Sequence, residues 1–307
     1  MHRPLQWQRG ETRASGAQTR AVAAAVLLTS ALWACAGAGA RGEEVPIYDV
    51  TADRSPVPCL RERAHSLVLV PFGQSNAGSQ GESAHKPAGD VINFNWADGR
   101  CYLAEDPLLG AAGARGRGSI WTRLADKLQR NGLFERIVIA PIAVDGSHVA
   151  EWVPEGKLWP RLPAVVQGLR ANGLEPDMFL WVQGEADASV TADPDAYKRD
   201  FLAMAAGIRE IVGSRAPIFI AVATLCYGQD TGPVLEHVEP ETRAAKWMGQ
   251  EAIQQAQRQL VDPARGLYPG PDLDFIGTPA RWDGCHLSTY GLDVAADLWK
   301  QRLLAPR

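Results

Sequence analysis

The sequence predicts an α/β protein in which a mainly parallel, five-stranded sheet is covered by helices on both faces, a three-layer and doubly wound arrangement. Two observations predict it. Continuous apolar runs without polar alternation recur along the chain, which is typical of strands buried on both faces. Segments with helical periodicity separate these runs, as the crossovers between parallel strands require.

The expected elements alternate along the chain. Four strands are predicted at 66–72, 137–144, 178–182 and 217–223, with a weaker fifth at 274–276. Helices are predicted at 120–130, 159–172, 194–213, 240–260 and 288–304. Asp193 and Pro194 suit the N-cap and first position of a helix, and Gly173 suits a helix end. Residues 79–118, rich in Gly, Ala and charge, are expected to form a long loop region.

Composition excludes several classes of protein. The chain has 307 residues, with 46% hydrophobic and 21% charged, which is a globular mix. Its 31 Lys and Arg against 35 Asp and Glu give a net charge of −4. A nucleic-acid scaffold would show a basic stripe, so no nucleic-acid partner is expected.

The N-terminus has the pattern of an export signal. A basic segment precedes the apolar run 21–34, and Ala38-Gly39-Ala40 supplies a cleavage site. The run is too short for a membrane span, which needs about 20 apolar residues. Residues 1–40 are therefore predicted to be a signal peptide and the protein to be periplasmic or extracellular. The alternative is a lipoprotein signal ending before Cys35, with a lipid anchor on that cysteine at the cell surface.

The rest of the chain is predicted to hold one domain, 65–307, preceded by an N-terminal extension, 41–64. Four cysteines remain after the signal: Cys59, Cys101, Cys226 and Cys285. Export permits two disulfides, and the sequence leaves their pairing open. No Cys-x-x-Cys pair occurs, and the histidines lack metal-ligand spacing, so no metal site is expected.

Residues able to do acyl-transfer chemistry follow the predicted strands. Ser75 follows the first strand, Gly146 the second and Gln183 the third. In open α/β sheets ligands bind beyond the carboxyl ends of the strands. A serine there can be a nucleophile, while a glycine N–H and a glutamine amide can donate to an oxyanion. Near the C-terminus, Asp283 stands three residues before His286, so that a carboxylate can orient an imidazole base toward the serine.

Taken together, these segments resemble those of the SGNH/GDSL hydrolase superfamily, and within it the sialate O-acetylesterase-type (SASA) branch, which includes acetylxylan esterases of carbohydrate esterase family six. The matching segments are 73–78 (GQSNAG), 146–147 with 151–152, 183–187 (QGEAD) and 283–287 (DGCHL). The resemblance implies the flavodoxin-like SGNH fold. It implies Ser75 as nucleophile, His286 as base and Asp283 as its orienting acid, with an oxyanion hole made by the N–H groups of Ser75 and Gly146 and the side chain of Gln183.

The implied function is an exported carbohydrate O-acetylesterase that works through an acetyl-enzyme and needs no metal or organic cofactor. Xylan, pectin-like chains, sialic acids and bacterial exopolysaccharides are all candidate substrates. Four residues are expected to face the substrate: Gln74, Asn76, Trp152 and Glu185. Two alternatives stay open, a non-catalytic carbohydrate-binding or assembly protein and an O-acetyltransferase on the same fold.

Overall fold

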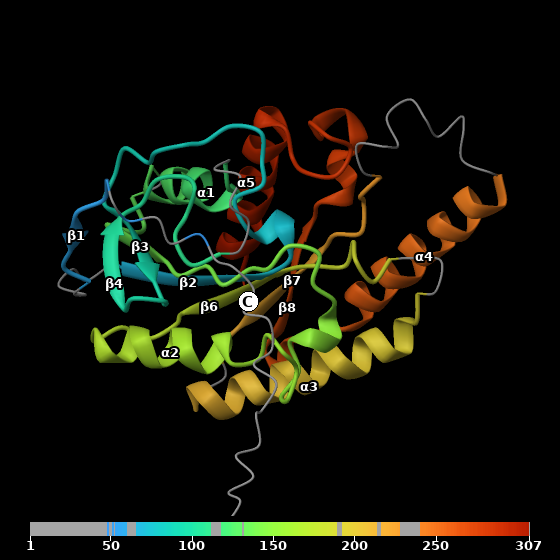
Figure 1. Ribbon diagram of the computed structural model, residues 1–307, viewed down its shortest axis with the longest axis horizontal. Helices are drawn as coiled ribbons and strands as arrows, with labels where there is room; N and C mark the ends of the chain where they lie inside the picture. Colours follow the sequence, from blue (N-terminus) through green and yellow to red (C-terminus); the bar gives the residue numbers. More distant parts are fainter. Residues whose placement is uncertain are drawn as a thin grey trace, which may run out of the picture. The chain divides into compact units, whose positions relative to one another are not determined.

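Helices cover both faces of a single mixed sheet (Figure 1). The computed structural model describes residues 48, 51, 53–59, 66–111, 118–130, 132–188, 192–213, 216–227 and 240–306. The predicted signal peptide, Cys35 and most of the predicted extension lie outside these residues. Among the helices that are described, none combines the length and apolarity that crossing a membrane requires.

The three-layer α/β class is confirmed, but the described residues form a sheet of eight strands where five were expected. The strands are β1 (Pro56–Val57), β2 (Ser66–Gly73), β3 (Val91–Asn95), β4 (Arg100–Leu103), β5 (Arg136–Ile139), β6 (Met178–Val182), β7 (Ile218–Val222) and β8 (Leu267–Asp272). The helices are α1 (Ile120–Gln129), α2 (Arg161–Ala171), α3 (Pro194–Val212), α4 (Pro240–Gln259) and α5 (Thr289–Leu304). The short 3-10 turns that matter below are η1 (Ser75–Ala77), η2 (Val149–Glu151) and η6 (Asp274–Ile276).

The strand order places β2 between β5 and β6, in the interior of the sheet. The order is β1-β4-β3-β5-β2-β6-β7-β8, with β2 parallel to both β5 and β6. Beyond β5 the chain continues alongside β2, where the Val144 N–H donates to the Gly73 carbonyl at 2.9 Å. Gly73 also pairs with Val182 of β6. The carboxyl ends of these three segments therefore meet at one edge, where the strand order reverses and ligands of such sheets bind.

Two sequence predictions about strands were wrong. Residues 79–118 contain β3 and β4, and 274–276 is the 3-10 turn η6. The strand next to η6 is β8, whose sequence LYPGPD looks unlike a strand. β8 pairs only with β7 at the end of the sheet. An edge strand tolerates proline, because one side of its backbone needs no ladder partner.

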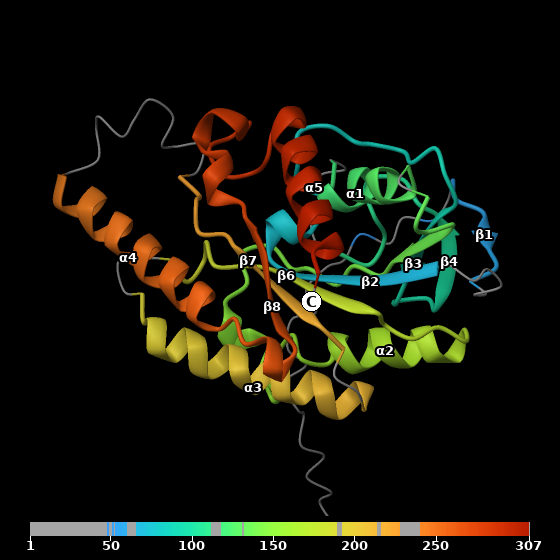
Figure 2. The ribbon, with the colours of Figure 1, turned by 180° about the vertical axis from the view of Figure 1, so that it is seen from behind.

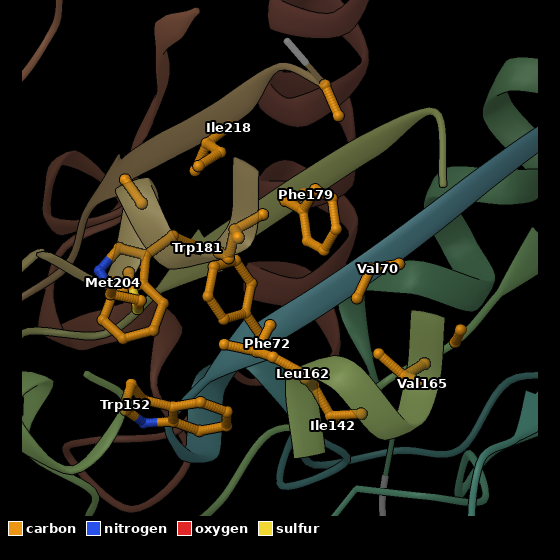
Figure 3. Close-up of a cluster of buried hydrophobic side chains, with 14 of the residues drawn as sticks. Val70, Phe72, Ile142, Trp152, Leu162, Val165, Phe179, Trp181, Met204 and Ile218 are labelled. Atoms are coloured by element: carbon orange, nitrogen blue, oxygen red, sulfur yellow. The ribbon is translucent and has the colours of Figure 1, made fainter. Parts of the chain in front are cut away.

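Alternate residues of β2 supply the two halves of the core. Val68, Val70 and Phe72 belong to the cluster that α2, α3 and α4 cover, which Figure 3 shows in part. Leu67 and Leu69 belong to the cluster on the opposite face, under α1 and α5, the pair of helices labelled together in Figure 2. All five side chains are at most 3% exposed. This double burial is why the strand has no polar alternation.

Side-chain caps begin three of the helices. Asp193 accepts from the N–H groups of Asp195 and Ala196, which confirms it as the α3 N-cap. Ser119 caps α1 and Ser288 caps α5 in the same way. Each cap satisfies N–H groups that have no partner inside the helix.

Two disulfides join the four cysteines of the domain. Cys59 bonds Cys101, which ties the segment after β1 to β4. The segment expected to be an extension thus supplies an edge strand and one half of a disulfide. Cys226 bonds Cys285, which ties the loop after β7 to the loop after β8. The two bridges that the sequence permitted are present, and the structure gives the pairing that the sequence left open.

Candidate active site

The chain makes a sharp turn directly after β2, which we call the nucleophile turn (Gly73–Gly78). Gly73 has φ +124°, and a Cβ atom there would lie 2.1 Å from the carbonyl oxygen of Val182. Only glycine allows β2 and β6 to approach so closely at this φ. The next N–H, from Gln74, donates to the same carbonyl at 2.9 Å. Ser75 then opens η1 and is 5% exposed.

The backbone N–H groups of Ser75, in this turn, and of Gly146, on the neighbouring segment, are free to bind a ligand. In the described part of the chain, neither of them donates a hydrogen bond. Gly146 has φ +64°, the left-handed conformation that favours glycine. Ser147 fixes this segment against β2, because its Oγ donates to the Gly73 carbonyl at 3.3 Å. Unengaged N–H groups held on a rigid sheet edge can stabilise a developing oxyanion.

Asp283 and His286 form a hydrogen-bonded pair in the loop Trp282–Leu287, called the base loop below. The imidazole Nδ1 lies 2.7 Å from Asp283 Oδ2. The other carboxylate oxygen, Oδ1, accepts from the backbone N–H groups of His286 at 2.7 Å and Cys285 at 3.0 Å. One carboxylate therefore shapes the loop and orients the imidazole.

The charge state of Asp283 fixes the tautomer of His286. Burial acts to raise the pKa of Asp283, but hydrogen bonds from the His286 ring and from backbone N–H groups outweigh it, so the pKa is lowered. An ionised carboxylate accepts only, so in the neutral imidazole Nδ1 carries the proton and Nε2 keeps its lone pair. Among the described residues Nε2 has no hydrogen-bond partner, and the side chain is 20% exposed.

Hydrogen bonds join the base loop to the nucleophile turn. Asn76 Nδ2 donates to the carbonyl oxygen of Cys285 at 3.3 Å, and these two residues are 209 positions apart in sequence. Close by, Trp282 Nε1 donates at 3.1 Å to the carbonyl of Gln80, two residues beyond that turn. Asn76 directly follows the serine and Cys285 directly precedes the histidine, so the structure brings these two predicted residues into neighbouring backbone segments. In the described contacts the serine hydroxyl has no hydrogen-bond partner, which is common before substrate binds.

Gln183 is engaged within the protein. It is fully buried, and its Nε2 donates to the Ser147 carbonyl at 3.0 Å and to the Asp187 carboxylate. An amide nitrogen carries two hydrogens, and both are used. These contacts do not support the expected donation from Gln183 to an oxyanion. They make Gln183 the link that holds the Gly146 segment to the end of β6.

Three residues expected to face the substrate instead contact one another or the backbone. Gln74 is 3% exposed, and its Oε1 accepts from two N–H groups of the loop after β6, at 3.3 and 3.0 Å. Asn76 Nδ2 donates to Glu185 Oε1 at 2.7 Å in addition to its bond to the base loop. Burial raises the pKa of Glu185 to about 7, against the opposing effect of the Asn76 hydrogen bond.

The position of Trp152 does not support the expectation that it faces the substrate. Trp152 is 0% exposed and lies edge-on against Phe72 and Trp181 in the core that Figure 3 shows. Its Nε1 donates to Ser147 Oγ at 3.0 Å. Aromatic residues near strand ends have the same sequence pattern whether they fill the core or line a site.

Trp282 is the aromatic residue at the site that sequence reasoning missed. Its ring lies 6.4 Å from that of His286, centroid to centroid, with an interplanar angle of 26°. It is partly exposed, and its Nε1 is fixed to the Gln80 carbonyl. Its place directly before Asp283 was the sequence signal that could have identified it.

Comparison with known families decides the class of the protein. Residues 66–270 match the family described as carbohydrate esterase, sialic acid-specific acetylesterase. The chain belongs to this family. It is a serine hydrolase that acts on acetyl esters. The match includes Ser75 and Gly146 and ends before the base loop.

Solved structures show the same fold at low sequence identity. A protein from Arabidopsis thaliana is 18% identical with a TM-score of 0.58, and covers 78% of this chain and 98% of its own. NanS is 16% identical with a TM-score of 0.53, and covers 78% of this chain and 97% of its own. No curated protein matches the esterase. Within the described residues, no three His, Cys, Asp or Glu side chains gather as metal ligands.

Proposed function

We propose that this esterase removes O-acetyl groups from a carbohydrate through an acetyl-enzyme, with Ser75 as nucleophile, His286 as base and Asp283 as its orienting acid. The observation that carries the proposal is the Asp283–His286 pair, at 2.7 Å. It leaves Nε2 unprotonated in a loop that is hydrogen-bonded to the nucleophile turn.

The chemistry follows from this arrangement. His286 Nε2 takes the proton of Ser75 Oγ as that oxygen attacks the acetyl carbonyl carbon. The imidazolium that forms is stabilised by the ionised Asp283. It then gives the proton to the leaving sugar oxygen as the C–O ester bond breaks. Water, deprotonated by the same Nε2, attacks the acetyl-enzyme and releases acetate and Ser75.

The oxyanion hole in this proposal consists of backbone groups. The N–H groups of Ser75 and Gly146 have no acceptor among the described residues and flank the carboxyl end of β2. A well-placed donor of this kind is worth about 3 kcal/mol of barrier in measured cases. Gln183 contributes by fixing Ser147 next to Gly146.

Two further observations support the proposal, one for an acetylated carbohydrate as substrate and one for export. The family description names a carbohydrate esterase and a sialic acid-specific acetylesterase. The two disulfides are compatible with an oxidising compartment outside the cytoplasm.

The direct test is release of acetate by residues 41–307 and by Ser75→Ala. We expect the wild type to hydrolyse 4-nitrophenyl acetate and acetylated sialic acid or xylan. We expect the variant to lose about 10³-fold or more in kcat with an unchanged circular-dichroism spectrum. The proposal would be ruled out if the wild type released no acetate from any of these esters or from acetylated exopolysaccharide. A fully active Ser75→Ala variant would rule out its mechanism.

Trp282→Leu is expected to lower kcat about fivefold. An aromatic face next to an imidazolium is worth about 1 kcal/mol, and leucine removes it. Trp282→Phe keeps a ring and should lose less, although it gives up the bond to Gln80. Trp247→Leu, at a tryptophan that is 60% exposed on α4, is the matched control. Equal rates for Trp282→Leu and this control would show that the stacked ring does not assist His286.

A further inference from the structure

Every polar group of Cys285, the residue before His286, is held by another part of the protein. Its N–H donates to Asp283 Oδ1 at 3.0 Å. Its sulfur is bonded to Cys226. Its carbonyl oxygen accepts from two side chains, Asn76 Nδ2 at 3.3 Å and Arg281 Nη1. The position of the histidine backbone is therefore set largely through this one residue.

Arg281, the residue directly before the base loop, also donates to the Cys285 carbonyl. Its side chain is 2% exposed. Nη2 donates to the Leu273 carbonyl at 3.1 Å and lies 3.6 Å from Asp274 Oδ1. The guanidinium thus connects the end of β8 to the base loop. Among the described residues it has no hydrogen bond to the nucleophile turn, so its hydrogen bonds do not join that turn to the base loop.

Asn76 is the side chain that spans the two segments. It is the middle residue of η1 and is 8% exposed. One hydrogen of its Nδ2 goes to Glu185 Oε1 at 2.7 Å and the other to the Cys285 carbonyl. Glu185 fixes the orientation of the amide, because its Oε1 accepts from the NH₂ group of Asn76. Both hydrogens are used, so Asn76 has none left for a substrate.

We propose that Asn76 is a positioning residue that acts through the Cys285 carbonyl to hold His286 in register with Ser75. The proposal rests on the function proposed above and adds a residue to its machinery. Asn76 follows the nucleophile and Cys285 precedes the base, so their hydrogen bond joins the two backbones at the positions next to the reacting residues. A displacement of about 1 Å between reacting groups can cost about 10²-fold in rate.

The test must separate the effects of the two hydrogen bonds that Asn76 donates, one to Glu185 and one to Cys285. Loss of its bond to Glu185 would leave a buried carboxylate without that donor and destabilise the fold. Loss of its bond to Cys285 should affect the rate alone. The double variant N76D/E185Q separates them, because the carboxylate introduced by N76D can accept from the amide introduced by E185Q, which restores that contact with reversed polarity. The new carboxylate has no hydrogen to offer the Cys285 carbonyl.

The experiment compares N76D/E185Q with E185Q, using 4-nitrophenyl acetate. We expect equal thermal unfolding midpoints within a few degrees, a kcat about 10²-fold below that of E185Q, and KM within about threefold. Equal kcat values would overturn the proposal. A raised KM with unchanged kcat would also overturn it, because it would assign Asn76 to substrate binding.

A second measurement separates this proposal from the proposed function. Diisopropyl fluorophosphate phosphorylates an activated serine and releases fluoride without any sugar or acetyl group. If the wild type labels at Ser75 but hydrolyses no acetyl ester, the proposed function fails and the positioning role is read from labelling rates. We then expect N76D/E185Q to label about 10²-fold more slowly than E185Q. Equal labelling rates, or no labelling of wild-type Ser75, would overturn the positioning role.

Discussion

Replacing Asp283 by Asn is expected to lower kcat about 10⁴-fold while leaving the protein folded. An amide can turn its NH₂ group toward Nδ1 of His286, and Nδ1 must then accept. The proton moves to Nε2, which can no longer take the Ser75 proton. The remaining amide oxygen can still accept from the two backbone N–H groups that Asp283 Oδ1 now binds. The loop should therefore keep its shape.

The measurement is kcat on 4-nitrophenyl acetate with urea unfolding of the same samples. Asp283→Ala is the companion variant. It loses the orienting group and the two backbone contacts, so we expect the same loss of rate together with a lower unfolding midpoint. An Asp283→Asn enzyme within tenfold of the wild-type kcat would contradict the role proposed for Asp283.

Replacing Gly73 by Ala is expected to destabilise the fold by about 4 kcal/mol or more. A Cβ atom at this position would lie 2.1 Å from the Val182 carbonyl oxygen and 3.1 Å from the Gln183 Cβ. Neither neighbour can move without parting β2 from β6 in the middle of the sheet. The residue also has φ +124°, which an L side chain rarely adopts.

Gly213→Ala is the matched control for Gly73→Ala. Gly213 ends α3 with φ +64°, and a Cβ atom there would meet nothing within 4 Å. Alanine at this position suffers no clash and meets only the penalty of the left-handed backbone conformation, which is about 1 kcal/mol. Urea unfolding of both variants gives the comparison. Similar losses would show that the clash at Gly73 is relieved by movement, and that the close approach of β2 to β6 is not required.

Sequence pattern predicted the buried middle of the fold well because burial on both faces is directly visible in composition. The sequence pattern failed to predict strands in which buried polar side chains form hydrogen bonds with the backbone. Asn93 lies inside β3, and its side chain accepts from the Leu109 N–H at 2.6 Å and donates to the Leu109 carbonyl at 3.1 Å. A buried asparagine that binds the backbone looks like a loop residue in a sequence. β8, which contains two prolines, was missed because an edge strand tolerates residues that are excluded from the interior of a sheet.

The sequence predicted which residues lie at the candidate site better than it predicted their hydrogen-bond partners and exposure. Spacing alone placed Asp283 within reach of His286, and the structure joins them at 2.7 Å. It could not show that the amide of Gln183 is consumed by Asp187 and the backbone, because those partners come from separate loops. Nor could it distinguish the buried Trp152 from the partly exposed Trp282, since solvent exposure depends on packing between distant segments.

The order of the strands along the chain decides how late in synthesis the catalytic residues are all present. The nucleophile turn follows the first parallel strand, β2, whereas the base loop follows the last, β8. During synthesis Ser75 is made long before His286, because the two residues are 211 positions apart in the sequence. Contacts between such distant positions form slowly, because a long loop must first be closed. A chain that is made or clipped short of His286 therefore holds a nucleophile without the base that would activate it.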